Sequence, residues 1–450
     1  MPKTCIIGAG VTGLSTAWQL KKNGEDIVVL ESHKEVGGAV QSIYNNGYLV
    51  EEGPNSIQLK SSQIEVFLNS IPGLKEQIID AQPDAKNRFI VRNKRPCPVP
   101  RGPLELLCNP LWSKLGCLRV LTELFKVKKS DNNEESVADF SRRRFGHEFY
   151  DYAINPLIGG IYAGNPEELS IRYAFPKLYA LENEHGGLIR GMIAKLIGTR
   201  KDSANKYSKR IISFKNGLST LPKLIAKALG DSIYLESKIH LIKSINDQWI
   251  VKWDNQCELF DRVIVTVPAH ALGKLPFENN LKNEFSQFCG IDHPPLSVLT
   301  LGFKREHINH ALDGFGLLVP ESERRTILGV LFPSSIFKGR APQGEVLLTV
   351  FIGGERNPKY ATSNTNKALA TAIPEIKSLL GVIGRPTFVH LKHWEKAIPQ
   401  YKIGYGRYIE ALNLIEENYP GIYMLGNYRN GISLDECLSS SINFGTKIYQ

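Results

Sequence analysis

Hydrophobic positions in residues 3–30 fall into three blocks that predict a strand, a helix and a second strand. Residues 3–7 form a short apolar run, residues 11–23 carry apolar side chains on one helical face, and residues 26–30 form another apolar run. Gly24 is well placed to end the helix. Two short apolar runs that flank an amphipathic helix are typical of a parallel β-α-β unit with buried strands.

Later segments continue this mixed pattern without an internal repeat. Residues 102–125 are strongly apolar, are interrupted by Pro110 and contain scattered basic residues, which indicates two short amphipathic helices. Residues 296–353 alternate apolar runs with turns and predict an antiparallel sheet. Further helix and strand patterns cover residues 217–229, 232–235, 239–245 and 261–268, and the last fifty residues predict a strand, a glycine loop and a closing helix. Together these patterns favour an α/β protein. Because an antiparallel sheet is predicted beside the parallel β-α-β unit, the chain as a whole is α+β.

Length and composition indicate a cytoplasmic globular protein of two or three domains. The chain has 450 residues, 42% of them hydrophobic and 22% charged. No apolar run approaches the roughly 18 residues of a membrane span, and the first glycine turn comes too early for a signal peptide. Its seven cysteines are odd in number and never spaced as CxxC, so we expect neither a disulfide framework nor a metal site.

A net charge of +10 favours an anionic partner, which could be nucleic acid, an acidic membrane surface or an acidic small molecule. No nucleic-acid-binding motif is present, so we do not expect nucleic acid. The densest basic stretch, residues 200–210, has no apolar periodicity and is interpreted as a solvated loop.

A glycine motif connects the first strand to the helix. Gly8 permits the tight bend, Gly10 lets the backbone approach a pyrophosphate, and Gly13 lets the helix pack closely on the strand. Glu31 ends the second strand, where a carboxylate can accept both hydroxyls of an adenosine ribose and would repel the phosphate of NADP. These features predict a dinucleotide site.

The segments after this unit favour FAD over NAD. An NAD domain ordinarily continues with further strand-helix units, whereas this chain has a second glycine pair at Gly37 and Gly38, then GYLVEEGPNS at residues 47–56. Another glycine loop lies near the C-terminus. This layout is typical of flavoproteins that bind FAD extended, with its flavin end held by the far end of the chain.

Longer motifs reveal a family. The stretches EEGPNSIQ, NRFIVRN, CPVPRGPL, PLIGGIYAGNPEELSIRYAFPKLYALENEHGG, SFKNGLSTLP, FKGRAP, HWEKAIPQY and LGNYRNGISLDECLSSS run in order from residue 51 to 441. Together with the glycine motif, they resemble the oxygen-dependent protoporphyrinogen oxidase family across essentially the whole chain. YAGNPEELS and the C-terminal loop are the most specific of them.

The resemblance implies a discontinuous, Rossmann-like FAD-binding domain, a mixed-sheet substrate domain, and a helical insert that faces the membrane and lines the substrate entrance. By position, the FAD-binding domain would comprise residues 1–90, 211–275 and 401–450, the insert residues 91–210, and the substrate domain residues 276–400. Residues 102–125 would belong to the membrane-facing part, where Leu104, Leu107, Leu111, Trp112, Leu115 and Leu118 lie beside Lys114 and Arg119. The alternative is a buried helical subdomain.

The resemblance also implies a set of contacts with non-covalent FAD. They would fall on Gly8, Ala9, Gly10, Val11, Thr12, Gly13, Glu31, Ser32, Ala39, Gly53, Pro54, Asn55, Ser56, Ile239, Ile432, Ser433 and Leu434. Relatives often have arginine two positions before the second glycine pair and a basic or bulky residue after it. Here these positions are Glu35 and Ala39, so side-chain contacts that depend on them are not expected, whereas backbone contacts there remain expected. Cys437 lies in the closing helix and is interpreted as a packing residue.

For the substrate, a flexible tetrapyrrole with propionates, the resemblance implies four contact residues. Arg88 would pair with a propionate, Leu318 and Phe337 would clamp a pyrrole ring, and Gly160 would present its backbone to the pyrrole nitrogens. On pattern alone, Arg88 would be a surface residue at a strand edge, and Leu318 and Phe337 would be core residues.

The implied reaction, in haem biosynthesis, is the six-electron oxidation of protoporphyrinogen IX to protoporphyrin IX, with O2 as acceptor and hydrogen peroxide as product. Cofactor and substrate carry this chemistry, so we predict no catalytic acid or base. His147, His185, His270 and His393 are interpreted as structural. Alternatives are coproporphyrinogen III oxidation, a flavin amine oxidase and a non-enzymatic flavoprotein. The oligomeric state stays open, with a homodimer as one alternative, as does peripheral membrane binding.

Overall fold

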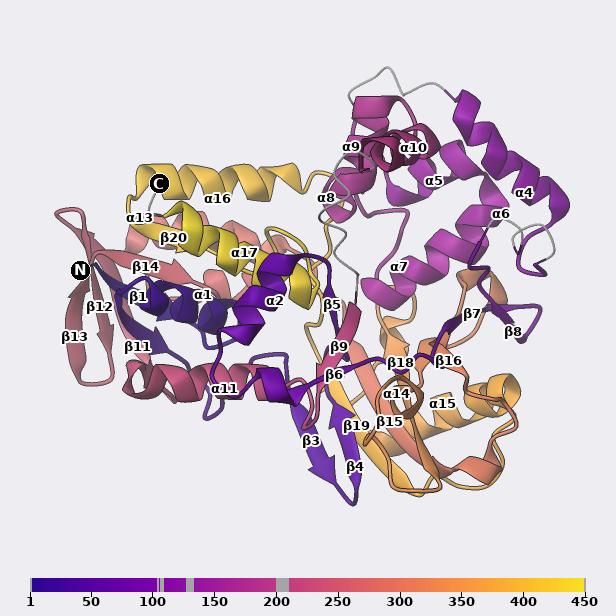
Figure 1. Ribbon diagram of the computed structural model, residues 1–450. Coiled ribbons are helices and arrows are strands. Elements are labelled where there is room, and N and C mark those ends of the chain that lie inside the picture. Colours follow the sequence, from indigo (N-terminus) through magenta and orange to yellow (C-terminus); the bar gives the residue numbers. More distant parts are fainter. Residues whose placement is uncertain (1, 103–104, 106–108, 127–132, 200–209, 449–450) are drawn as a thin grey trace.

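The computed structural model describes residues 2–102, 105, 109–126, 133–199 and 210–448. A five-stranded parallel sheet lies at the left of Figure 1, and a seven-stranded mixed sheet lies at the lower right. A group of helices lies above the second sheet, whereas both chain ends lie beside the first. Among the described residues, no helix has both the length and the apolar character that crossing a bilayer requires.

The parallel sheet collects strands from distant parts of the chain. Its order is β10-β2-β1-β14-β20, with bounds Ile233–Tyr234, Asp26–Leu30, Lys3–Ile7, Arg262–Val265 and Ile422–Met424. Helix α1 (Val11–Lys22) connects β1 to β2 and packs between α11 (Thr220–Leu229) and α17 (Leu434–Lys447). Apart from the partly buried edge strand β10, the strands are mostly buried, which explains their unbroken apolar runs. The predicted β-α-β unit and α/β class are confirmed.

Smaller sheets surround this unit. Strands β11 (Ile239–Ile245), β12 (Gln248–Trp253) and β13 (Gln256–Phe260) form an antiparallel meander whose first turn has positive φ at Asn246 and Asp247. Two successive residues with positive φ match the twist of the flanking strands. A hairpin, β3 (Ser42–Asn45) with β4 (Tyr48–Glu51), and a sheet of β5 (Ile57–Leu59), β9 (Arg210–Phe214) and β6 (Ile78–Asp80) lie toward the second large sheet.

The seven-stranded sheet has the order β19-β15-β18-β17-β16-β7-β8. Neighbouring strands are antiparallel except for the parallel pair β7 and β16. Helix α15 (Thr365–Leu380) packs on one apolar face. Strand β7 crosses position 90, the expected end of the first FAD segment, and is part of this sheet. The bounds are Phe388–Trp394, Leu296–Lys304, Glu345–Gly353, Ile327–Leu331, Gly314–Leu318, Asn87–Arg92 and Arg95–Pro98.

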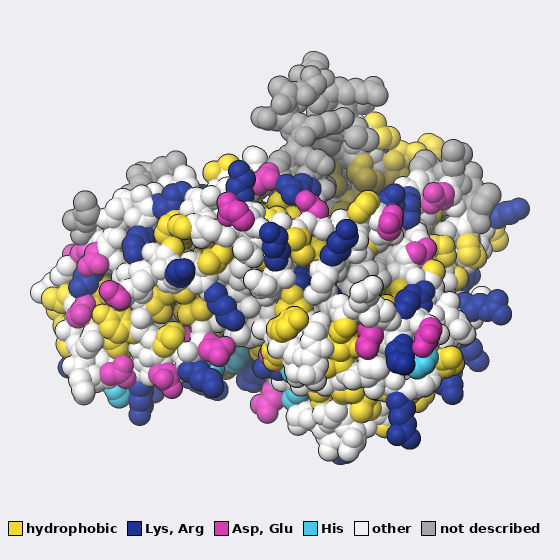
Figure 2. Space-filling model, turned by 60° about the horizontal axis from the view of Figure 1, so that its bottom comes forward, with side chains coloured by type: hydrophobic (Ala, Val, Ile, Leu, Met, Phe, Trp, Pro, Cys, Tyr) yellow, Lys and Arg dark blue, Asp and Glu magenta, His cyan; other side chains and the backbone are white. Residues whose placement is uncertain are grey.

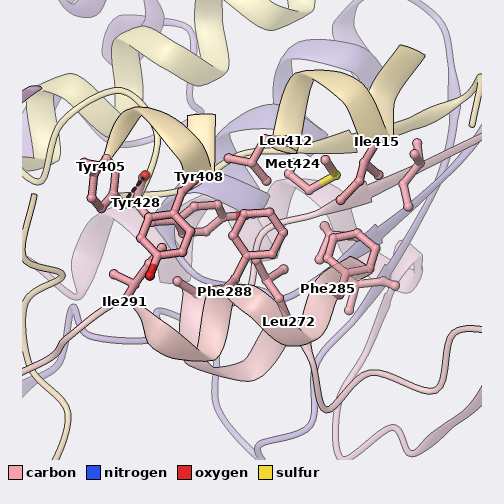
Figure 3. Close-up of a cluster of buried hydrophobic side chains, with 14 of the residues drawn as sticks. Leu272, Phe285, Phe288, Ile291, Tyr405, Tyr408, Leu412, Ile415, Met424 and Tyr428 are labelled. Atoms are coloured by element: carbon pink, nitrogen blue, oxygen red, sulfur yellow. Dashed lines mark hydrogen bonds between the residues drawn. The ribbon is translucent and has the colours of Figure 1, made fainter. Parts of the chain in front are cut away.

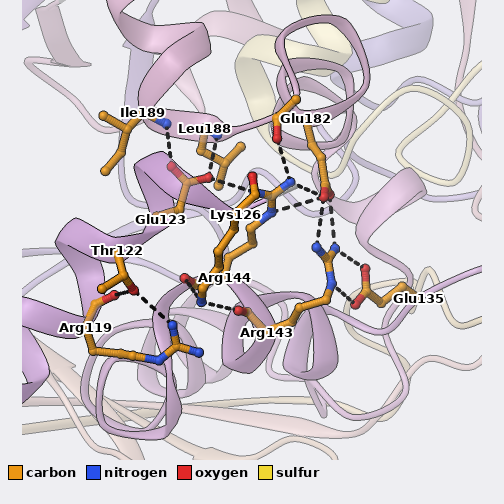
Figure 4. Close-up of polar contacts among 11 residues, drawn as sticks. Arg119, Thr122, Glu123, Lys126, Glu135, Arg143, Arg144, Glu182, Leu188 and Ile189 are labelled. Carbon is orange, nitrogen blue, oxygen red and sulfur yellow. Dashed lines mark hydrogen bonds and ion pairs between the residues drawn. The ribbon is translucent and has the colours of Figure 1, made fainter. Parts of the chain in front are cut away.

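The helical group is held together by buried ion pairs (Figure 4). Arg144 of α5 (Val137–Phe145) is fully buried and bonds to Glu182 of α9 (Pro176–His185) and, at 3.2 Å, to Glu123. Glu123 also accepts hydrogen bonds from the backbone N–H groups of Leu188 and Ile189, at the start of α10 (Leu188–Thr199). These shared contacts fix the helices relative to one another.

The described residues of the segment 102–125 are neither wholly buried nor wholly exposed. Leu111 is buried, and Trp112, 9% exposed, stacks on Phe149 with ring centroids 5.6 Å apart. On α4 (Lys114–Leu121), by contrast, Leu115 and Leu118 are 79% and 59% exposed. The expectation that all these apolar residues share one membrane-facing surface is therefore wrong for Leu111 and Trp112. Leu104 and Leu107 lie outside the described residues.

A cluster of buried aromatic and aliphatic side chains positions the C-terminal segment (Figure 3). Phe288, which lies just after α13 (Asn279–Ser286), packs near Tyr408 of α16 (Gly406–Asn418), with ring centroids 6.1 Å apart. Tyr405 donates a hydrogen bond to the carbonyl of Tyr428 at 2.6 Å. This bond fixes the loop between β20 and α17 to the buried aromatic cluster.

Candidate functional site

The glycine turn leaves open space in front of helix α1. A Cβ atom built on Gly13 would lie 2.0 Å from the carbonyl oxygen of Gly8, so only glycine fits there. A Cβ on Gly10 would meet no atom within 4 Å. Gly10 is the N-cap of α1, no side chain caps the helix, and its first turn has no acidic residue. An uncapped helix N-terminus facing open space is suited to an anion such as a pyrophosphate.

Glu31 lies beside this turn at the end of β2. Its Oε2 accepts a hydrogen bond from the backbone N–H of Ala9 at 2.7 Å, and its Oε1 accepts one from the N–H of His33 at 2.9 Å. The carbonyl oxygen of Glu31 accepts a bond from the N–H of Ser237, two residues before Ile239. The structure therefore brings Glu31 and Ser32 close to the segment that contains Ile239.

The second glycine pair packs on the first turn. The N–H of Gly37 donates to the carbonyl of Ala9 at 2.8 Å, and a Cβ on Gly38 would lie 3.3 Å from Cα of Gly10. A Cβ on Gly53 would lie 2.2 Å from the carbonyl oxygen of Ala39. Ala39 and the start of the segment Gly53–Ser56 therefore lie next to the glycine turn.

The C-terminal segment reaches the same place from the other end of the chain. Ser441 of α17 donates a hydrogen bond to the carbonyl of Thr12 at 3.1 Å. Ser433 and Glu436 form a capping box that fixes the start of α17, beside Ile432 and Leu434. Cys437 is buried, and burial raises the pKa of its thiol to about 11. A neutral buried thiol agrees with its interpretation as a packing residue.

These contacts fit the adenosine and pyrophosphate parts of FAD. Contacts among the predicted residues form a strip, which we call the cofactor strip, that runs from Glu31 through the glycine turn to Ala39 and Gly53, and α17 bonds to this turn at Thr12. Thr266, at the end of β14, was not predicted. Its hydroxyl donates to the carbonyls of Ile7 and Gly8 at 3.0 Å, and so fixes the glycine turn to the end of β14. A threonine after a buried strand gave no signal in the sequence.

The face of the seven-stranded sheet opposite α15 carries the substrate candidates; we call it the substrate face. Cross-strand pairing places residues of six strands in each of two adjacent rows. The first row is His390, Thr300, Thr349, Leu331, Gly316 and Arg88, and the second is Lys392, Val298, Phe351, Gly329, Leu318 and Ile90. At about 4.8 Å per strand, the first row spans about 24 Å. Arg88 and Leu318 therefore lie at the same end of the substrate face.

Arg88 presents a guanidinium with no acceptor within hydrogen-bond distance among the described residues. Its side chain is exposed and lies over the ring of Phe315, 5.3 Å from the centroid. Gly160, on α7 (Asn155–Ile161), faces the next row, because a Cβ there would lie 2.5 Å from Cδ2 of Leu318. Three of the four substrate candidates thus come together.

Phe337 is placed differently. Its side chain is 2% exposed, and the guanidinium carbon of Arg340 lies over its ring, 5.4 Å from the centroid. Arg340 is itself buried and donates to the hydroxyl of Ser213 at 2.7 Å. In this arrangement Phe337 is a core residue, which is the interpretation that the pattern alone suggested.

A charged cluster at the other end of the substrate face was not predicted from the sequence. Glu52 bonds to Nε2 of His390 at 2.9 Å and to Nζ of Lys392 at 3.1 Å, and its carbonyl accepts from Nε1 of Trp394 at 2.8 Å. The hydrogen bond from His390 lowers the pKa of the Glu52 carboxyl, although burial opposes the shift. Because the next residue, Gly53, belongs to the cofactor strip, Glu52 connects this strip to the substrate face.

Known proteins share this architecture. A family model described as flavin containing amine oxidoreductase matches residues 11–443. Mitochondrial protoporphyrinogen oxidase of Nicotiana tabacum is 34% identical over 98% of this chain and 93% of that protein. Coproporphyrinogen III oxidase of Bacillus subtilis (strain 168) is 25% identical over 96% of this chain and 95% of that protein. A solved structure from Exiguobacterium sp. 255-15 has a TM-score of 0.81 at 22% identity, covering 99% of this chain and 98% of that one.

The family match and the full-length relatives show a flavin-dependent oxidoreductase, and the fold and the glycine contacts agree with that class. The chain belongs to the flavin-containing amine oxidoreductase family. Its resemblance to the protoporphyrinogen oxidases, inferred from the motifs, is confirmed by full-length relatives of that kind.

Proposed function

We propose that the protein is an FAD-dependent oxidase that converts protoporphyrinogen IX to protoporphyrin IX, with O2 as electron acceptor. The observation that carries this proposal is the placement of Arg88, an exposed cation without an ion-pair partner among the described residues, on the same sheet face as Leu318, against which Gly160 of α7 packs. An apolar surface beside one cation suits a tetrapyrrole that carries propionates. The similarity to plant protoporphyrinogen oxidases along the whole chain supports the same substrate.

FAD is the form of flavin that the site supports best. An adenine dinucleotide needs a ribose acceptor and a pyrophosphate site, and Glu31 and the α1 N-terminus lie side by side. When bound, FAD supplies a hydride acceptor that oxygen can reoxidise to give hydrogen peroxide.

The protein's own residues would bind and orient the substrate. Arg88 would form a charge-assisted pair with a propionate, and Leu318 and Gly160 would fix the tetrapyrrole by contact. No side chain is assigned as a catalytic acid or base. Phe337 would affect the substrate only through packing.

Coproporphyrinogen III is the second candidate, because relatives that oxidise it also match almost the whole chain. It carries four propionates where protoporphyrinogen carries two, and a single candidate cation, Arg88, favours the substrate with two propionates. Anaerobic mixing of the purified flavoprotein with each porphyrinogen, monitored at the flavin absorbance band, tests the proposal. Fast bleaching by protoporphyrinogen alone is expected. Bleaching by coproporphyrinogen alone would reassign the substrate, and no bleaching by either would refute the proposal.

The cellular site that we propose is the cytoplasm, with peripheral binding to an anionic membrane through α4. Leu115 and Leu118 of α4 are exposed, as is Phe125, which lies four residues after its end. On the face shown in Figure 2, basic side chains are scattered among acidic ones, so the described residues of that face form no single large basic patch. Wild type should pellet with phosphatidylglycerol vesicles at low salt, and the double variant Leu115→Glu, Leu118→Glu should not. Leu414→Glu, at a comparably exposed leucine of α16, is the control. Equal pelleting of all three proteins would exclude this surface.

A further inference from the structure

The turn after β18 contacts the segment at the end of helix α7. The N–H of Glu355 donates to the carbonyl of Ala163 at 2.8 Å, and its Oε2 accepts from the N–H of Asn165 at 3.0 Å. Gly354 has a φ of +68°, and a Cβ there would lie 2.5 Å from the carbonyl oxygen of Ala163. The segment after α7 is thus fixed by backbone contacts that tolerate no side chain at Gly354.

Arg356, in the same turn, makes the contacts at the start of the helix. Its Nη1 donates to the carbonyl of Val319 at 2.7 Å, and its Nη2 donates to Oδ1 of Asn155 at 3.0 Å. The same Oδ1 accepts from the N–H of Glu321 at 2.9 Å. Arg356 therefore joins the end of β16, which carries Leu318, to the first residue of α7.

The glycine pair of α7 lies between these contacts. A Cβ on Gly159 would lie 3.0 Å from Nη2 of Arg356, and a Cβ on Gly160 would lie 2.5 Å from Leu318. The guanidinium of Arg356 thus occupies the space that a side chain at Gly159 would need, and Leu318 occupies the space that one at Gly160 would need. No other described cation bonds both α7 and β16, and Arg356 has no carboxylate within 4 Å among the described residues.

We propose that Arg356 is a positioning residue that sets the separation between α7 and β16 at Gly160 and Leu318, and hence the width of the substrate site. It acts through Asn155 and the Val319 carbonyl, without touching the substrate. The proposal rests on the proposed function, because that function makes Leu318 and Gly160 substrate contacts. A bidentate fork between two elements is a task for which lysine is a poor replacement, since an ammonium cannot present two parallel donors.

Arg325 provides a matched control. It lies just before β17 of the same sheet, and pairs with Glu375 of α15 on the opposite face. Like Arg356, it is partly buried and joins a strand end to a helix. Arg325→Gln should therefore cost stability without changing the substrate face.

Two measurements on the holoenzyme test the proposal. Hydrogen exchange of peptides covering residues 155–165 should be about fivefold faster or more in Arg356→Gln than in wild type, and unchanged in Arg325→Gln. The KM for the porphyrinogen should rise about tenfold in Arg356→Gln while kcat and FAD content stay near wild type, with Arg356→Lys intermediate.

The outcomes are distinguishable. If exchange in residues 155–165 is unchanged in Arg356→Gln, or if both arginine variants raise KM equally, Arg356 is not a positioning residue. If wild type oxidises no porphyrinogen, the proposed function fails, and the exchange measurement alone then decides whether Arg356 fixes α7. Faster exchange with an unchanged KM would confine the role of Arg356 to stability, and so overturn the proposal.

Discussion

Gly10→Val should remove the flavin while leaving the fold intact. Gly10 has φ −71° and ψ 176°, a backbone conformation open to any residue, and a Cβ there meets no protein atom within 4 Å. The new side chain would instead project into the open space in front of α1, where the pyrophosphate is expected. Its cost should therefore fall on the cofactor and not on the protein.

The magnitudes separate these effects. A change of N-cap from glycine to valine costs the apoprotein about 1 kcal/mol. Loss of bound FAD removes RT ln(1 + [L]/Kd), which is about 2.7 kcal/mol at a free FAD concentration of one hundred times Kd. Wild type should thus gain thermal stability when FAD is added, and Gly10→Val should gain none.

The assay is flavin content after desalting, together with thermal melts with and without added FAD. Gly13→Ala is the contrasting variant, because its Cβ would lie 2.0 Å from the Gly8 carbonyl oxygen and so should destabilise the apoprotein itself. Retention of stoichiometric FAD by Gly10→Val would refute the assignment of the glycine turn as the pyrophosphate site. Release of FMN from denatured wild type, or flavin that stays on the chain, would refute non-covalent FAD.

Three further outcomes are expected. Arg88→Ala should raise the KM for protoporphyrinogen by one to two orders of magnitude, roughly 1.5–3 kcal/mol, with FAD content unchanged; wild-type kinetics would remove Arg88 from the substrate site. Arg144→Met should cost about 3–5 kcal/mol in urea unfolding of the helical group, because it leaves Glu123 buried without its cation and Glu182 paired with Arg143 alone, whereas a loss below 1 kcal/mol would mean that water or rearrangement compensates. The lowered pKa of Glu52 means that its pairing with His390 stabilises the fold above the ordinary glutamate pKa, about 4.3, and that this contribution is lost as the pH falls through the lower folded value. Thermal midpoints measured from pH 7 to pH 3 should therefore fall less steeply in Glu52→Gln than in wild type, and parallel curves would contradict this account.

Local sequence patterns were sufficient to predict the first β-α-β unit. The strands β1 and β2 and helix α1 are predictable from periodicity over thirty residues, and Gly8, Gly10 and Gly13 have roles that depend only on their own backbone and nearest neighbours. The substrate face depends on strand pairing between residues far apart in sequence. Arg88 lies opposite Gly316 because β7 pairs in parallel with β16, and no periodicity in either strand specifies that register.

The hydrophobic pattern also could not predict which residues of a short apolar stretch are buried. Trp112 and Leu115 are three positions apart and equally compatible with an amphipathic helix, yet Phe149 covers only Trp112. Phe337 is buried partly because Arg340, three residues later, turns back over its ring. Each outcome depends on how the chain folds around the residue, so residue type and spacing could not determine it.

Glu52 connects the two halves of the proposed site. Oxidation of a substrate by a bound flavin requires the two to be held at a fixed separation, so the connection between cofactor strip and substrate face must be stiff. Glu52 precedes Gly53, which packs on Ala39 of the strip, and its carboxylate and carbonyl contact three residues of β19: His390, Lys392 and Trp394. One residue thus bonds to an edge strand through both its side chain and its backbone. Since β19 pairs along its whole length with β15, a shift of Glu52 relative to the substrate face would break several bonds at once.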